Sequence, residues 1–434
     1  MVGESNMENL EFQRIKELII LTNKKIDEGL SNGTLEYEKR FIVKSTANNF
    51  NDNEQGSFSC GRSFQLISKN VWFKNDGKKI IKKSIQDSQA YKKALDCLNS
   101  IYRSNINAKY LNSLIYHTIA LLEDKSILNH KEIEVLAENF IREINDEPIT
   151  YGAHVELCGI TLLRVKIDLT EGVYLRRPKA EDVEREFDIY PSVCDDTRNP
   201  SAILNIEFLL KDTNELHEYV YKEVALLRLF KVGSVDFIRY DEYSGSILKS
   251  GSSITKLTNN VLDSYSLLEK DEVKLREFWN KFSPILPDSF FGFNQTQIDY
   301  LTIAFNRYDD SLFMFGSSKS VPEKRLSSSI MGLEALFLKT SERNELNYKL
   351  SKRISKFMGL LGYDAIKIGK TVKEAYNLRS KFVHGDHLDS EDILKFERRI
   401  KGENFKILNE KEGMQHFIRF VIELLRVSVL LIML

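Results

Sequence analysis

The chain has 434 residues, of which 42% are hydrophobic and 29% are charged. This length is typical of two or three domains, and the hydrophobic content is sufficient for packed cores. The formal net charge is −1 at pH 7, so no overall basic field indicates nucleic-acid binding. The four cysteines, Cys60, Cys97, Cys158 and Cys194, are far apart, which argues against structural zinc and a disulfide framework and favours a reducing, cytoplasmic location.

Neither end of the chain has the pattern of a membrane segment. Residues 1–11 are polar and acidic, unlike a secretory signal peptide. The apolar C-terminal segment is interrupted by Arg419, Glu423 and Arg426, and its uncharged run 427–434 is far shorter than the roughly 20 residues that a bilayer requires. We expect it to form a core or interface helix.

The sequence predicts an α+β fold that is mainly α, in three regions. Residues 1–150 are expected to be mainly helical, because apolar residues recur every three or four positions. The helices are expected at about 9–29, 86–103, 107–123 and 130–144. The segment 71–82 predicts a small β-hairpin, because Asp76-Gly77 supplies the positive φ angles of its turn.

The second region, 151–255, is expected to be a mixed, strand-rich domain, because strand patterns replace the helical period after Pro148. Strands are expected at 155–168, 173–175, 203–210, 235–240 and 246–249, and one helix at 215–230. Gly172 marks a turn, and the Gly/Ser segment 250–253 marks a domain boundary. The third region, 256–434, is expected to be helical throughout. Its helices are predicted at about 269–282, 296–315, 322–339, 345–358, 364–384 and 412–433.

The most informative segment is 376–385, in which Arg379 and His384 stand at the expected end of an amphipathic helix closed by Gly385. Arg379 is a permanent cation suited to binding phosphate. His384 can transfer protons near neutral pH, because an unperturbed histidine has a pKa of about 6.5. Together they suffice to cleave RNA without a metal, since one holds the scissile phosphate and the other moves the proton of the ribose 2′-hydroxyl. The spacing alone is more typical of a surface arginine and a helix-ending histidine than of a catalytic pair.

Three segments, 332–339, 350–357 and 376–385, resemble in order and spacing the Apea-like branch of the HEPN superfamily (higher eukaryote and prokaryote nucleotide-binding domains). The resemblance covers about residues 295–434 and is looser over the middle of the chain. That family's active-site pattern, an arginine followed by a polar residue and, within four to six residues, a histidine, corresponds to Arg379, Ser380 and His384.

The resemblance implies a C-terminal HEPN-type helical bundle and a metal-independent endoribonuclease. Its products would be 2′,3′-cyclic phosphate and 5′-hydroxyl ends, and its role anti-phage defence in bacteria or toxin-like growth arrest. The chain departs from the antitoxin-paired members of the family at Asp386, where those have tyrosine. Their mode of regulation is therefore not carried over.

Two further residues are expected to support the site. Ser380 either orients His384, touches phosphate, or faces solvent. Glu334 lies on an otherwise apolar helix, where an unpaired carboxylate is costly, so a salt bridge to Arg353 or Arg379 is expected.

Positive charge accumulates just before His384. From 341 to 384 there are ten Lys or Arg residues against four Asp or Glu residues, a local net charge of +6. This run is either a solvated helix face or an electropositive track leading to Arg379. On the second interpretation, RNA contacts are expected at Lys352, Lys356, Lys373 and Lys381.

No cofactor or metal site is predicted. The pair His384 and His387 lacks a fuller set of ligands, and the loop 56–61 lacks the Lys-Ser/Thr ending of a phosphate-binding loop. Arg176 and Arg177 at a strand end either contact an RNA backbone or regulatory nucleotide or form a solvated turn.

Two functions therefore stay open: an endoribonuclease acting on RNA, with tRNA among the candidate substrates, and a non-catalytic module that binds RNA or a partner and dimerises. Cleavage needs one group to accept the 2′-hydroxyl proton and another to protonate the leaving oxygen. We therefore expect a homodimer in which the 364–384 helices face each other and the 412–433 helix lies beside them. Alternatively, the 412–433 helix completes the core of the monomer. The apolar residues in question are Phe417, Phe420, Val421, Leu424 and Leu425.

Overall fold

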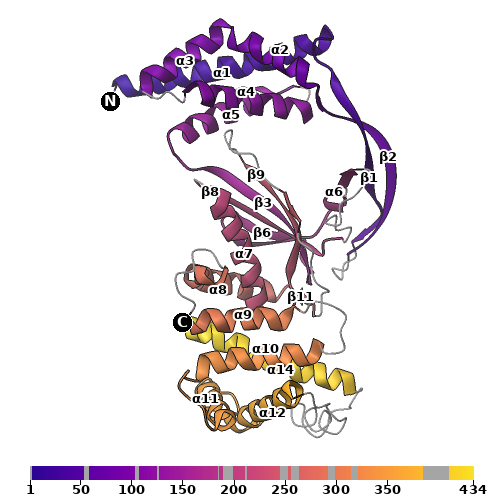
Figure 1. The fold of residues 1–434 in the computed structure, drawn as a ribbon, viewed down its shortest axis with the longest axis vertical. Helices are drawn as coiled ribbons and strands as arrows, with labels where there is room; N and C mark the ends of the chain where they lie inside the picture. The colour runs from indigo at the N-terminus through magenta and orange to yellow at the C-terminus, as the bar shows by residue number, and fades with distance from the viewer. Residues whose placement is uncertain are drawn as a thin grey trace.

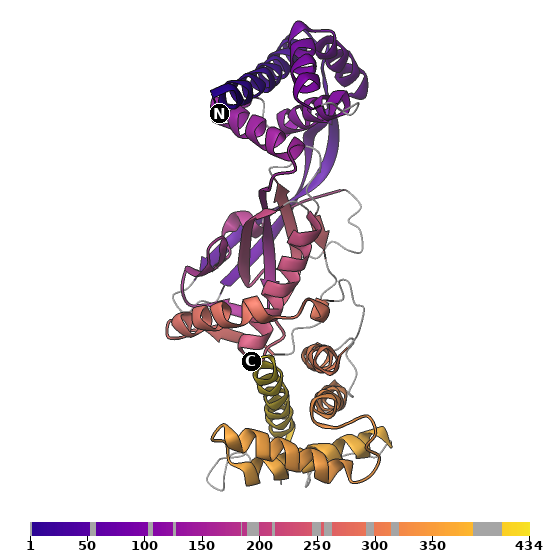
Figure 2. The same cartoon turned by 90° about the vertical axis from the view of Figure 1, so that its left-hand side faces the viewer.

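The computed structural model describes residues 2–52, 58–102, 107–124, 127–183, 185–188, 199–210, 213–244, 253–255, 263–291, 299–313, 321–384 and 410–434. The molecule is elongated, with a helical region at each end and a β-sheet between them (Figures 1 and 2). The predicted α+β fold that is mainly α is confirmed.

The N-terminal helices enclose a hydrophobic core of their own. They are α1 (Val2–Ser31), α2 (Asn75–Gln86), α3 (Gln89–Ile101), α4 (Asn107–Asp124) and α5 (His130–Ile144). The buried side chains of this core include Ile15, Leu114 and Phe140. A capping box, in which Asn129 and Glu132 each accept from the other's backbone N–H, starts α5.

A long antiparallel hairpin, β1 (Tyr37–Asp52) and β2 (Phe58–Phe73), runs from these helices past the side of the central sheet (Figure 1). The hairpin predicted at 71–82 is wrong, because β2 ends at Phe73 and α2 begins at Asn75. Gly77 does not form a turn. It is buried, and a Cβ atom there would lie 2.8 Å from the carbonyl oxygen of Thr34, so glycine allows the close approach of the two segments.

The central sheet has the strand order β10-β9-β3-β8-β6-β5, with antiparallel neighbours throughout. Its strands are β3 (Ile149–Cys158), β5 (Lys166–Thr170), β6 (Val173–Arg176), β8 (Ala202–Leu210), β9 (Asp236–Ser244) and β10 (Ser253–Thr255). The predicted turn at Gly172 joins β5 to β6, with φ of 75°. The strand predicted at 246–249 lies outside the described residues.

The single strand predicted over 155–168 is instead divided among β3, β4 (Ile160–Leu162) and β5. The division falls at Gly159, where φ is 78° and an added Cβ would meet the carbonyl oxygen of Ser234 at 2.3 Å. β4 pairs in parallel with β11 (Tyr265–Leu267), so the third region is not helical throughout.

Helix α7 (Thr213–Phe230) packs against the sheet, and the core that it closes continues into the C-terminal helices. These are α8 (Asp271–Phe282), α9 (Tyr300–Leu312), α10 (Val321–Phe337), α11 (Leu346–Leu360), α12 (Ala365–Val383) and α14 (Glu410–Met433), and two short 3-10 turns, η1 (Ser283–Ile285) and η2 (Asp288–Phe291), follow α8. Within the described residues, none of the helices has the length and apolar character needed to cross a membrane.

Helix α14 packs against α9 and α10 inside the chain (Figure 2). Its side chains expected near a dimer contact are at most 3% exposed at Phe417, Val421, Leu424 and Leu425. Phe420 is partly buried against the same core. The helix therefore completes the monomer's core. The four buried side chains, those of Phe417, Val421, Leu424 and Leu425, cannot line a contact between two copies.

The C-terminal end of α7 is held by side chains of the helical region. Helix ends leave carbonyl groups without intrahelical partners. The carbonyl of Leu227 accepts from the Tyr265 hydroxyl at 2.7 Å, and that of Arg228 accepts from the Tyr308 hydroxyl at 2.6 Å. Arg426 donates to the carbonyls of the last turn. The sheet and the C-terminal helices are thus joined by buried polar contacts as well as by a shared core.

Candidate active site

The predicted site residues lie on and around α12. This helix starts at the N-cap Asp364, whose carboxylate accepts from the backbone N–H groups of Ile366 and Lys367 at 3.0 Å each. It ends at His384, the C-cap residue. One face is buried against the neighbouring helices through Ile368, Val372, Ala375 and Leu378. The core thus fixes the helix, and the other face is left to solvent.

Arg379 points toward α10 and forms an ion pair with Glu334. Its Nη1 lies 3.3 Å from Oε1 of Glu334, and the two side chains are 24% and 20% exposed. The ring of Tyr376 lies beside the guanidinium, 5.8 Å from its centroid to Cζ of Arg379. Glu334 therefore pairs with Arg379, one of the two partners expected from the sequence.

This ion pair leaves one strong donor unused. Nε of Arg379 is buried and has no acceptor among the described residues. A buried donor without an acceptor costs about 1–3 kcal/mol. Burial also raises the pKa of Glu334, although Arg379 and Tyr376 oppose that shift. The cluster is therefore not arranged for maximum stability.

His384 is solvent-exposed at the end of α12, and its backbone N–H donates to the carbonyls of Ser380 and Lys381 at 3.2 Å each. None of the hydrogen bonds among the described residues joins its ring to Arg379. Five helical positions correspond to a rotation of about 140°, so the two residues leave the helix in different directions. The structure therefore places the predicted pair on one helix end without bringing the two side chains together in a single chain.

Arg353, the other possible partner of Glu334, is engaged elsewhere. Its guanidinium binds both carboxylate oxygens of Glu342, at 2.8 and 2.6 Å, and the carbonyl of Phe337 at 2.7 Å. Hydrogen bonds from Arg353 and from the backbone N–H of Lys339 lower the pKa of Glu342 to about 2. Arg353 thus closes the α10–α11 connection, and no contact places it at Arg379.

Three of the four predicted RNA-contacting lysines are exposed on α11 and α12. Lys352 and Lys356 are exposed on α11, and Lys373 is exposed on α12. Lys370, also on α12, extends the same surface. Lys381 and Ser380 are half-buried in the last turn before His384. Positive charge therefore follows the outer side of the two helices toward the histidine.

Two asparagines that the sequence patterns do not single out connect these helices. Nδ2 of Asn347, at the start of α11, donates to Oδ1 of Asn377 on α12 at 2.6 Å. The same Nδ2 lies 3.5 Å from the carbonyl oxygen of Lys373, while Oδ1 of Asn347 is buried without a donor. Asn377 is exposed. Asparagine is common on helix surfaces, so no sequence signal marks this pair.

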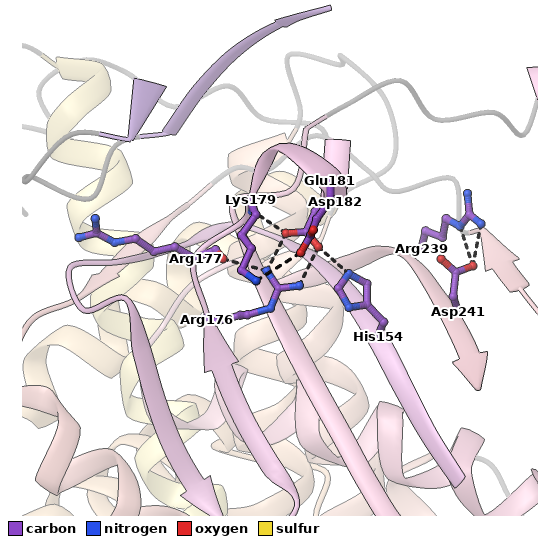
Figure 3. Close-up of polar contacts among 8 residues, drawn as sticks. All are labelled: His154, Arg176, Arg177, Lys179, Glu181, Asp182, Arg239 and Asp241. Atoms are coloured by element: carbon purple, nitrogen blue, oxygen red, sulfur yellow. Dashed lines mark hydrogen bonds and ion pairs between the residues drawn. The ribbon is translucent and has the colours of Figure 1, made fainter. Parts of the chain in front are cut away.

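A separate polar cluster lies in the middle region (Figure 3). Asp182 of α6 (Ala180–Val183) binds both terminal nitrogens of Arg176, at 2.6 and 2.7 Å, and lies 3.1 Å from Nε2 of His154 on β3. Arg177 donates to the carbonyls of Leu162 and Leu163. Arg176 therefore holds the α6 segment against the sheet, and Arg177 holds the same strand end to the end of β4, so the two arginines do not form a solvated turn.

This cluster also fixes the chain that follows. After α6, β7 (Arg185–Asp188) pairs with β1 of the long hairpin. The Asp182 contacts thus attach the hairpin from the N-terminal region to the central sheet. The described residues contain no group of three or more His, Cys, Asp and Glu side chains arranged to hold a metal ion. A surface cavity of about 560 Å³ lies between the β5–β6 hairpin and α8, and no predicted site residue lines it.

Comparisons of the chain with protein-family models, with curated proteins and with solved structures found no match.

Proposed function

We propose that the chain is a metal-independent endoribonuclease of the HEPN type, with its site at the C-terminal end of α12. The observation that carries the proposal is Arg379, half-buried with its Nε lacking an acceptor, five residues before an exposed His384 at the end of a lysine-bearing helix. Phosphate oxygens are suitable acceptors for such a guanidinium. The resemblance of residues 332–385 to the HEPN pattern supports the same assignment.

The proposed reaction is an internal transfer at phosphorus. The ribose 2′-oxygen forms a bond to phosphorus as the bond from phosphorus to the 5′-oxygen breaks, which gives a 2′,3′-cyclic phosphate and a 5′-hydroxyl. His384 takes the 2′-hydroxyl proton or protonates the leaving oxygen, a role typically worth about 10²–10⁴-fold. Arg379 stabilises the extra negative charge on the phosphorane-like transition state.

A single chain supplies one histidine, whereas the reaction uses a base and an acid. We therefore include a homodimer in the proposal, with α12 of each copy contributing to one cleft. Since α14 is buried in the monomer, the contact would rest on α11 and α12 and not on the apolar C-terminal helix. The separation of Arg379 from His384 within one chain is compatible with an arrangement in which the arginine of one copy serves the histidine of the other.

One observation favours the alternative, a non-catalytic module that binds RNA or a partner. Glu334 already occupies one side of the Arg379 guanidinium, as it would in a purely structural ion pair. In that case the basic surface would bind RNA, and the histidine would only end the helix.

The two functions are separated by incubating purified protein with total RNA and with a tRNA pool in excess EDTA and sequencing the ends that form. We expect cleavage that survives chelation, with cyclic phosphate ends, and loss of cleavage in Arg379→Ala and in His384→Ala. Both side chains lie near a helix end, so the variants should keep the wild-type circular dichroism spectrum. Strict dependence on Mg²⁺ or Mn²⁺, or full activity in both variants, contradicts the proposal. RNA binding without any cleavage supports the alternative.

A further inference from the structure

The outer face of α12 carries a row of polar side chains at helical spacing. Lys373, Asn377 and His384 occupy positions i, i+4 and i+11, which lie within about 40° of one another around the helix axis. All three are exposed. Asn377 stands two turns before His384, a distance of about 10 Å along the axis. Stacked nucleotides of one strand repeat every ~3.4 Å, so an RNA strand cleaved at His384 would pass Asn377 within about three nucleotides of the cut.

The amide of Asn377 is held in one orientation. Nδ2 of Asn347 faces the carbonyl oxygen of Lys373 at 3.5 Å, and a carbonyl oxygen can only accept a hydrogen bond. The nitrogen of the Asn347 amide therefore faces α12. Since Nδ2 of Asn347 is a donor, the atom of Asn377 that lies 2.6 Å from it is the acceptor Oδ1. Consequently Oδ1 of Asn377 is occupied, and its Nδ2 donors have no partner among the described residues.

The orientation of the Asn347 amide leaves a buried acceptor without a hydrogen bond. Oδ1 of Asn347 is buried and receives no hydrogen bond from any described residue. Buried polar groups without partners are uncommon in native proteins and often mark functional positions. Oδ1 of Asn347 is left unsatisfied because the Asn347 amide is oriented with its nitrogen toward Asn377, which holds the Asn377 amide in one orientation.

We propose that Asn377, oriented by Asn347, reads a base of the bound RNA and selects keto bases over amino bases. A free asparagine amide recognises adenine by accepting from its N6 amino group while donating to a ring nitrogen. The contact with Asn347 turns the oxygen of Asn377 toward α11, so the side of the amide that points away from α11 carries its Nδ2 donors. Donors match the keto oxygens of guanine (O6) and uracil (O4) and leave the amino groups of adenine and cytosine without an acceptor. Bases of single-stranded RNA expose these edges to side chains.

This inference rests on the proposed binding of RNA along α12, but not on cleavage. It is therefore tested in a His384→Ala background, by measuring the affinity for oligouridine and for oligocytidine of equal length. These two probes differ at position 4 of the base, where uracil has a keto oxygen and cytosine an amino group. We expect oligouridine to bind about tenfold more tightly, the discrimination typical of a good side-chain contact to a base edge.

Substitution of Asn377 should change this ratio in a predictable direction. Asn377→Asp keeps the oxygen that accepts from Asn347 and replaces the donors by a second acceptor, so the preference should shift toward oligocytidine. Asn347→Ala frees the Asn377 amide to turn, so the two affinities should become similar. The matched control is Asn344→Asp, which adds the same charge at an exposed position before α11 and should leave the ratio unchanged.

The outcomes separate the two proposals. An equal ratio for the parent and for Asn377→Asp overturns base selection by Asn377, whether or not the wild-type protein cleaves RNA. Keto preference without cleavage by the wild-type protein overturns the ribonuclease and leaves the base selection standing. Where cleavage occurs, sequencing of the ends should show uridine or guanosine enriched at one position within about three nucleotides of the cut, and the enrichment should be lost in Asn377→Asp. Absence of RNA binding in all variants overturns both proposals.

Discussion

The basic surface on α11 and α12 can be tested through the salt dependence of RNA binding. Lys352, Lys356 and Lys373 are exposed, so truncating them to alanine should leave the thermal midpoint nearly unchanged. Each phosphate neutralised on a single strand contributes about −0.7 to the slope of log K against log salt concentration. Three lost contacts should therefore flatten the slope by about 2. If the two lines converge near about 1 M salt, where electrostatic attraction is screened, the triple variant binds about 100-fold more weakly at about 0.1 M.

Fluorescence anisotropy with a labelled single-stranded RNA, between low and high salt, measures both slopes directly. A matched control removes three exposed lysines from the N-terminal helices, Lys79, Lys92 and Lys93, and so changes the net charge of the protein by the same amount. Equal slopes for wild type and the α11–α12 variant, or an equal loss in the control, would show that the basic surface is only a solvated helix face.

Three further predictions follow from the rest of the structure. Asp182→Asn breaks a buried ion pair and should destabilise the protein by about 3 kcal/mol in denaturant titration at pH 7, whereas Glu181→Gln, at an exposed neighbour, should have little effect. Contacts from Arg176, His154 and the Lys179 backbone lower the pKa of Asp182 despite its burial, so its contribution is complete above the unfolded pKa of about 3.9 and should fade as pH falls below that value. Leu114→Ala, in the separate N-terminal core, should lower the free energy of unfolding by about 2–5 kcal/mol. It should speed amide hydrogen exchange in α1 to α5 but not in the central sheet, and equal acceleration in both would contradict the separation of the cores. Sedimentation should show a homodimer that strengthens with salt or RNA, because facing α12 helices bring Lys370 and Lys373 of two copies together; a strict monomer that cuts RNA rules out the composite site.

Apart from α2 and the short α6, the helices were predictable from the sequence, because each has a buried face and a helical periodicity. The prediction at 364–384 matches α12, which buries Ile368, Val372 and Ala375 at spacings of three and four. The hairpin at 71–82 failed because Asp-Gly is also compatible with a helix start, where Asp76 favours the first turn. The close approach of Thr34 to Gly77 is a tertiary contact, and no local pattern contains that information.

The candidate site was predictable in its residue types but not in its contacts. An unpaired carboxylate at Glu334 would be costly to bury, so an arginine partner was predicted. In the structure this partner is Arg379, because Arg353 forms its ion pair with Glu342 on the connection between α10 and α11. The Asn347–Asn377 contact joins two helices through residues that are common on helix surfaces. It could not be predicted from the sequence, because it depends on how α11 packs against α12. The same holds for the joining of the sheet to the C-terminal helices, which rests on carbonyls at the end of α7.

Stability alone does not account for the polar cluster between α10 and α12. A half-buried ion pair gains little over apolar residues of similar size, because both charges must leave water. Here the balance is worse than usual, since Nε of Arg379 has no acceptor and burial raises the pKa of Glu334. The neighbouring positions of α12 show that this helix can be anchored by apolar side chains such as Val372 and Leu378. A chain under selection for stability alone would place such a residue at 379 as well. We propose that Arg379 stands there because it binds a phosphate of the nucleic acid that the neighbouring lysines also contact.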